Sequence, residues 1–175
     1  MTTGTKSVLF GVHCPLIHPW FVALAWGRLY GFPARPQLWL AFFIHDLGYW
    51  GKHRMDDDIG ETHPELGAAI MGRVFGKEWG DFVRYHSRFY AKRDKRPFSR
   101  LCLADKYALC LTPFWLYLPL AKLSGELAEY RHIGADTSGK YGGIHNQRNE
   151  REWYYGVQTY LRQWVRENKD RAEHE

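Results

Sequence analysis

The sequence predicts an all-α fold in a single domain that covers residues 1–175. Apolar residues recur at helical spacing through most of the chain, and the alternating pattern of strands is nearly absent. A length of 175 residues suits one domain with a sizeable core, and two full domains are not expected. The composition, with 45% hydrophobic and 25% charged residues, is that of a globular protein.

About seven helices are expected, and turn and cap residues agree with them. They cover residues 18–30, 36–47, 64–75, 77–90, 98–112, 114–130 and 148–168. Pro36 suits the first turn of the second helix, and Gly31 and Gly76 suit C-terminal caps. Thr62 and Glu65 have the spacing of a capping box at the start of the third helix. The helices between 114 and 168, including an aromatic stripe over residues 153–164, are expected to pack on the others.

The charge and the cysteines limit the classes of partner and location. A net charge of +5 and an isoelectric point near 9.1 favour a small anionic, phosphate-containing substrate. Nucleic acid is not expected, because no recognition motif is present. The three cysteines have no CxxC spacing, which predicts reduced thiols and a cytoplasmic location. No membrane span is expected, since the longest apolar tract, residues 107–121, contains two prolines and is shorter than roughly 20 residues.

Five expected helices carry an ionisable residue within their own apolar stripe. In the second helix, Leu38, Ala41, Phe42 and His45 share one face. The same spacing places His18 with Val22, Ala25 and Leu29; His63 with Leu66, Ile70 and Val74; His86 with Phe82, Val83 and Tyr90; and Asp105 with Leu101, Ala108 and Leu109. An unsatisfied buried polar group costs about 1–3 kcal/mol, and an unpaired charge costs more. Five such costs would rival the roughly 5–15 kcal/mol stability of a domain, so we expect a common compensation.

A metal centre would compensate these costs together. Imidazole and carboxylate bind divalent transition metals, and the binding energy adds to folding. Adjacent His45 and Asp46 differ by about 100° around the helix, so both can face one centre. Four imidazoles and two carboxylates exceed the needs of one open tetrahedral site and suit two ions with Asp46 between them. Two divalent ions and two carboxylates leave a charge of plus two, which attracts an anion.

The ordered set of these residues resembles the six-ligand, binuclear H…HD…H…H…D signature of the HD superfamily of metal-dependent phosphohydrolases. The likeness covers residues 17–111, through "IHPWFVALA", "FFIHDLG", "THPELGAAI", "VRYHS" and "LCLADKYAL". It implies an orthogonal helical bundle. It also implies two ligand sets: His18, His45, Asp46 and Asp105 for one metal, and Asp46, His63 and His86 for the other.

The resemblance implies a metal-dependent phosphohydrolase that acts on a nucleotide or another small phosphate ester or anhydride, through hydroxide formed between the metals. Small bacterial hydrolases of dinucleoside polyphosphates have the most similar layout. Iron or manganese is expected, with cobalt, nickel and zinc as alternatives. The same ligands occur in mixed-valent diiron oxygenases that cleave C–C or C–P bonds, which is the alternative function. A non-catalytic nucleotide-sensing module is a third hypothesis.

Substrate contacts are expected from basic residues that follow the ligands, namely Arg88, Lys92 and Lys52. Lys106 is expected to turn away from the ligand face, and Tyr49 stands where many members of the superfamily have a lysine. His13 is a rival for the place of His18.

Two loops have lesser expectations. Residues 56–58 are three aspartates, expected to form a solvated loop. Residues 138–148, "SGKYGGIHNQR", lack the spacing of a phosphate-binding loop, and a lid is the role considered for them.

Overall fold

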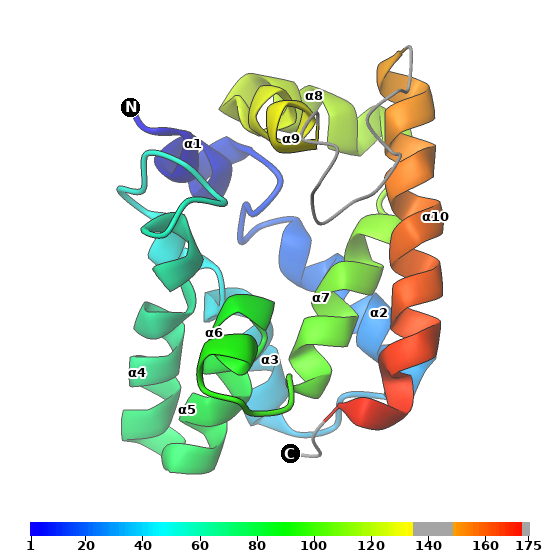
Figure 1. Ribbon diagram of the computed structural model, residues 1–175. Coiled ribbons are helices and arrows are strands. Elements are labelled where there is room, and N and C mark those ends of the chain that lie inside the picture. The colour runs from blue at the N-terminus through cyan, green and yellow to red at the C-terminus, as the bar shows by residue number, and fades with distance from the viewer. Residues whose placement is uncertain (135–148, 173–175) are drawn as a thin grey trace.

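A computed structural model describes residues 1–134 and 149–172, with the side chains of 132–134 left aside. These residues form helices and contain no β-strand, which confirms the all-α class (Figure 1). The loop of residues 138–148, considered as a lid, lies outside the described residues.

The helices follow one another along the chain, and the longest described connection is that of residues 45–63 between the third and fourth helices. They are α1 (Thr3–Phe10), α2 (His18–Tyr30), α3 (Pro36–Ile44), α4 (Pro64–Phe75), α5 (Lys77–Arg84), α6 (Arg88–Arg93), α7 (Arg100–Leu111), α8 (Phe114–Ser124), α9 (Glu126–Gly134) and α10 (Glu150–Asn168). Short 3₁₀ helices are η1 (Leu47–Tyr49), η2 (Gly60–Thr62) and η4 (Lys169–Arg171).

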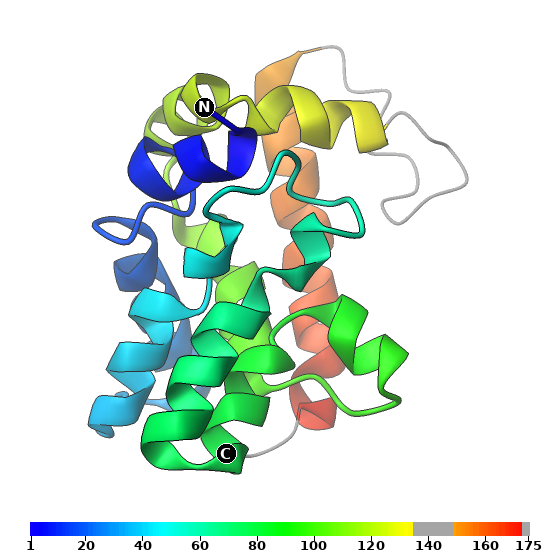
Figure 2. The same cartoon turned by 90° about the vertical axis from the view of Figure 1, so that its left-hand side faces the viewer.

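Helix α7 lies in the middle of the bundle and carries packing on two sides. It packs against α2 on one side and against α10 on the other, while α4 pairs with α5 and α1 packs on α8 (Figures 1 and 2). Fully buried Val22, Phe42 and Leu101 belong to the main core between α2, α3 and α7. A second cluster, around Tyr117 and Tyr154, joins α8 to α10. Apolar burial therefore fixes both sides of α7.

Several helix boundaries differ from the sequence-based expectation. Helix α1 was not expected, and the second expected helix ends at Ile44 and continues only as η1. The helix expected over 77–90 breaks before α6, where the Ser87 hydroxyl caps the new helix by accepting from the Phe89 amide. The helix expected over 114–130 breaks at Gly125, whose φ of +91° is favourable only for glycine.

The expected inward stripe of α4 is wrong. Leu66, Ile70 and Val74 are 47%, 36% and 59% exposed, and the buried residues of this helix are Pro64, Gly67, Ala68 and Met71. Gly80 of α5 shows the reason, because a Cβ there would lie 3.0 Å from the Ala68 carbonyl oxygen. Small residues let the two helices approach closely, which gains more packing than the bulkier stripe would.

The expected capping box at the start of α4 is not formed. His63 is the N-cap and makes no side-chain capping bond, while the Thr62 hydroxyl donates to the Ile59 carbonyl. Over the described chain, none of the helices combines the length and the apolar character that crossing a membrane requires.

Candidate metal centre

The end of α3 places a histidine and an aspartate inside the core. The helix buries Leu38, Ala41 and Phe42, and its last apolar turn leads directly to His45 at the C-cap. His45 and Asp46 are 1% and 6% exposed. The apolar face that drives α3 into the core therefore takes these two polar side chains with it.

Two glycines bring the start of α4 against this turn. A Cβ on Gly48 would lie 2.0 Å from the carbonyl oxygen of His63, and a Cβ on Gly67 would lie 2.7 Å from that of Ile44. Both obstacles are backbone atoms, which cannot rotate away. The two positions thus need glycine for His63 to reach the side chains of His45 and Asp46.

Replacing Gly48 with alanine should destabilise the protein and lower its metal content. Forced overpacking costs about 1–3 kcal/mol, and here the backbone that carries a ligand must move. Thermal unfolding and metal analysis of the purified variant would measure both effects. Gly27→Ala is the matched control, because nothing lies within 4 Å of a Cβ at this helical position. It should keep its metal and gain roughly 0.5–1 kcal/mol; equal behaviour of the two variants would contradict the packing argument.

The structure brings together all six residues that the sequence singles out as ligands. They come from five places in the chain: the first residue of α2, the end of α3, the N-cap of α4, the turn after α5, and the middle of α7. Their donor atoms form two groups, each within 4.8 Å, that share one residue: His18, His45, Asp46 and Asp105; and Asp46, His63 and His86. All six are buried.

Three of the imidazoles are oriented by the backbone in the same way. Nδ1–H of His45, His63 and His86 donates to the carbonyl oxygen three residues earlier, over 3.0, 3.0 and 2.6 Å. Nε2 is therefore the nitrogen of each ring that is left to bind an ion, and it faces the centre. Such an outer hydrogen bond fixes the tautomer that metal coordination requires.

The lone pairs of two imidazoles face each other. Nε2 of His63 lies 3.1 Å from Nε2 of His86, and in both rings Nδ1–H donates a hydrogen bond to a backbone carbonyl. Two lone pairs at this distance repel unless a cation lies between them. The position is suited to an ion that binds both nitrogens.

Asp46 divides its two oxygens between the two groups. Oδ2 lies 3.0 Å from Nε2 of His45 and 3.4 Å from Nε2 of His18. Oδ1 lies 3.4 Å from Nε2 of His86 and 3.6 Å from Nε2 of His63. Bonds of about 2.0–2.2 Å to a shared ion separate neighbouring ligand atoms by about 3.0–3.6 Å. Nε2 of His45 and Oδ2 of Asp46 are also buried without a hydrogen-bond partner, so the donor set fits transition-metal binding.

Burial keeps two of the histidines neutral. It lowers the pKa of His63 well below its usual range, and the nearby His86 acts in the same direction. It also lowers the pKa of His18, against the opposing effect of Asp105. Both imidazoles therefore hold the free lone pair that a metal ligand needs.

The carboxylates stay charged in spite of their burial. Burial alone would raise the pKa of Asp46, but His45 and His13 hold it well below its usual range. Lys106 does the same for Asp105. Burial opposes charge on His45, yet the two carboxylates raise its pKa to about 10. A metal ion bound at Nε2 of His45 would take the place of the proton that these carboxylates favour there.

His13 lies beside the centre but in neither group of donor atoms. Its Nδ1 lies 3.2 Å from Oε2 of Glu126, and its Nε2 lies 3.9 Å from Oδ2 of Asp46. Of the two rivals in the sequence, His18 is the one within the donor groups. The pairing of His13 with Glu126 was not anticipated, because neither residue follows an apolar stripe that would mark it.

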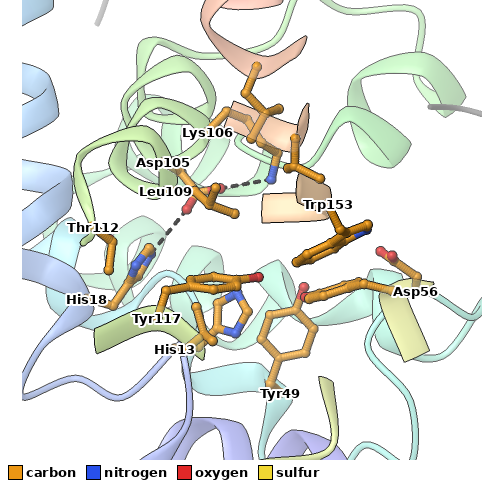
Figure 3. Close-up of a pocket in the computed structure, with 14 residues that line it drawn as sticks. His13, His18, Tyr49, Asp56, Asp105, Lys106, Leu109, Thr112, Tyr117 and Trp153 are labelled. Atoms are coloured by element: carbon orange, nitrogen blue, oxygen red, sulfur yellow. Dashed lines mark hydrogen bonds and ion pairs between the residues drawn. The ribbon is translucent and has the colours of Figure 1, made fainter. Parts of the chain in front are cut away.

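A cavity opens on one side of the centre and extends to α10. It has a volume of about 140 Å³ and is partly open to solvent. Its residues come from the turn after α1, from α7 to α10 and from the loop after α3: Val12, His13, His18, Tyr49, Asp56, Asp105, Lys106, Leu109, Thr112, Tyr117, Tyr130, Trp153, Val157 and Leu161 (Figure 3). Asp56 is half-buried where it lines the cavity, and Asp58 is exposed.

Lys106 also lines this cavity, and the expectation that it turns away is wrong. Its Nζ lies 2.9 Å from Oδ2 of Asp105, whose Oδ1 lies 3.1 Å from Nε2 of His18 (Figure 3). The lysine leaves α7 about 100° from Asp105, but its long stem curves back to the ligand. Asp105 raises the pKa of Lys106 above its usual value, against the effect of burial.

The three basic residues expected to contact substrate do not line this cavity. The Arg88 guanidinium lies 5.1 Å from the centre of the Trp164 ring. Lys52 donates to the Thr62 hydroxyl, and Lys92 is exposed. Their roles toward substrate stay predictions, and Lys106 is the basic residue that the geometry adds.

Comparison of the chain with protein-family models, with curated proteins and with solved structures gives no match. The likeness to the HD superfamily therefore stays a prediction from the sequence. A functional assignment depends on the donor geometry and on the cavity beside it.

Proposed function

We propose that the protein is a metal-dependent phosphohydrolase that holds two transition-metal ions, with iron or manganese as the first candidates. The observation that carries the proposal is the division of Asp46 between two groups of imidazoles. A carboxylate that faces one group with each oxygen is suited to bridge two ions. Two such ions would supply an activated water near neutral pH and balance charge on a phosphoryl group.

The chain's own residues would hold the ligands in place and bind the substrate. The Tyr49 ring stacks on His63, with 3.9 Å between ring centres and 11° between planes, which limits rotation of this imidazole. An ammonium has three donors, and the contact with Asp105 uses one of those on Lys106. The remaining donors would bind a phosphoryl oxygen next to the ligands. This charge supports an anionic substrate.

Metal analysis together with phosphate release tests the proposal. The protein, purified with and without oxygen, is expected to contain two transition-metal ions per chain and to release phosphate from simple phosphate esters. Chelation should abolish the release and added metal should restore it. Stoichiometric iron with O₂ consumption and no phosphate release would replace the hydrolase by the oxygenase.

Lys106→Met should weaken catalysis while the ion content stays at two. The variant keeps most of the aliphatic stem and loses the charge. One charge-assisted hydrogen bond is worth about 1.5–3 kcal/mol, so kcat/KM should fall roughly 10- to 150-fold. Lys77→Met is the matched control. This lysine is 85% exposed and does not line the cavity, so we expect a change of less than about threefold. A loss in Arg88→Met with none in Lys106→Met would place the phosphate contact at Arg88, where the sequence predicts it.

A further inference from the structure

We propose that the substrate is a phosphate monoester with one phosphoryl group on an aromatic or otherwise apolar body. The body would lie against the wall that α10 forms, and the phosphoryl group would lie beside Lys106. This inference rests on the proposed function and goes on to name the class of substrate. The two ends of the cavity carry it independently of the ligand geometry.

The end of the cavity near the centre is polar and charged. His18, Asp105 and Lys106 lie together there, and His13 is next to them (Figure 3). Lys106 is the one lysine or arginine lining the cavity within residues 1–134 and 149–172. This end can therefore bind one compact anion.

The opposite wall is apolar along its whole length. Trp153, Val157 and Leu161 are spaced four residues apart on α10, so they form one stripe that faces the cavity. Leu109 of α7 and the ring of Tyr117 continue this surface. A sugar or another polyhydroxylated body would lose hydrogen bonds to water at such a wall, whereas an aromatic ring gains by burial.

Helix α10 is attached to α7 by other residues than those of the stripe. The Tyr154 hydroxyl donates to the Thr112 carbonyl just after α7, and Gln158 Nε2 donates to the Leu109 carbonyl over 3.1 Å. Arg162 donates to the Cys110 carbonyl over 2.6 Å. These carbonyls belong to the last turn of α7 or follow it directly, where no helical amide satisfies them. Polar contacts thus hold α10 in place while its apolar stripe faces the cavity.

The charges along the cavity favour a single phosphoryl group over a polyphosphate. A second phosphate would lie beyond Lys106, and the charged residue on the cavity wall there is Asp56, a carboxylate (Figure 3). Like charges repel in a site of low dielectric. The dinucleoside polyphosphates that the sequence suggests are therefore disfavoured in this cavity.

The test compares three substrates on the metal-loaded, full-length protein. 2-Phenylethyl phosphate and glycerol 1-phosphate both release a primary alcohol, so the comparison isolates the body. Burial of one ring should raise kcat/KM for the phenyl ester roughly tenfold or more over that for the glycerol ester. Diadenosine tetraphosphate should be the poorest substrate. Phosphate is the product measured for the two esters, and ADP, AMP and ATP are the products measured for the tetraphosphate. A preference for either of the last two substrates overturns the inference but leaves the hydrolase, whereas no phosphate from the esters and no nucleotide from the tetraphosphate overturns both.

A variant and a binding measurement locate the effect in the cavity. Val157→Trp should fill the apolar end and reduce the preference for the phenyl ester at least fivefold, with little change for the glycerol ester. Tyr155→Trp is the control, because Tyr155 lies on the same helix and is 45% exposed. Calorimetry on the wild type needs no variant: 2-phenylethylphosphonate should bind about tenfold tighter than methylphosphonate. Equal affinities would overturn the proposed apolar site even if esters are hydrolysed.

Discussion

Asp46→Ala should remove both metal ions from the protein and abolish phosphate release. One oxygen of Asp46 faces His18 and His45, and the other faces His63 and His86. Loss of the carboxylate takes a ligand from each proposed ion. It also takes away half of the negative charge of the donor set, since Asp105 is its only other carboxylate. Metal analysis of the purified variant, with phosphate release as the second readout, measures the effect.

Two further variants serve as controls for Asp46→Ala. His63→Ala removes a donor from one group only, so it should keep one ion of the two. Asp56→Ala removes an aspartate that lines the cavity but belongs to neither group, and it should keep both. Full ion content in Asp46→Ala would end the bridging assignment. Loss of both ions in His63→Ala would argue for a single coupled site.

For His45 and Asp105 the sequence was sufficient, because each lies in phase with an apolar stripe that is buried. His45 continues the stripe of Leu38, Ala41 and Phe42, which is buried in α3. Asp105 lies among buried neighbours on α7 in the same way. Helical periodicity gives the direction of a side chain directly, so a polar residue in phase with the core is visible without a structure.

Periodicity failed where close packing of small residues decides which face is buried. In α4 the bulkier stripe of Leu66, Ile70 and Val74 is exposed, and the face with Gly67 and Ala68 is packed. The prediction that Lys106 turns away from the ligands failed for another reason. Helix geometry fixes the direction of its Cβ, but four further bonds allow the ammonium to return to Asp105.

The contact between His13 and Glu126 is the least predictable part of the site from sequence, and it joins distant segments. Glu126, the first residue of α9, is fully buried. Its Oε1 accepts from the Ser124 hydroxyl over 2.7 Å and from the Val12 amide over 3.3 Å. Its Oε2 lies 3.2 Å from Nδ1 of His13 and accepts from the Tyr130 hydroxyl over 3.5 Å. The carboxylate thus ties the turn between α1 and α2 to α9.

The charges of this pair support each other. Burial opposes the charge of His13, but Glu126 and Asp46 raise its pKa to about 9. Burial alone would raise the pKa of Glu126, and His13 outweighs it, so this pKa is lowered from its ordinary value of 4.5. Each group therefore keeps its charge near neutral pH because the other is present.

Glu126→Ala should strongly destabilise the fold. It leaves the imidazolium of His13 buried without its partner, and breaking a buried pair costs about 3–5 kcal/mol. Urea unfolding at neutral pH would measure the difference from the wild type. The matched control is Glu150→Ala at the first position of α10. It removes a carboxylate that pairs with Lys122 at the surface, at a cost of about 0–1 kcal/mol.

The stability that Glu126 contributes should also depend on pH. Because the pKa of Glu126 is lowered, its charge stabilises the fold above pH 4.5, and this contribution is lost as the pH falls further. The difference in the free energy of unfolding between wild type and Glu126→Ala should therefore become smaller in acid. A difference that does not change with pH would show that packing, and not the charge pair, stabilises this junction. Equal losses in Glu126→Ala and Glu150→Ala would show the same.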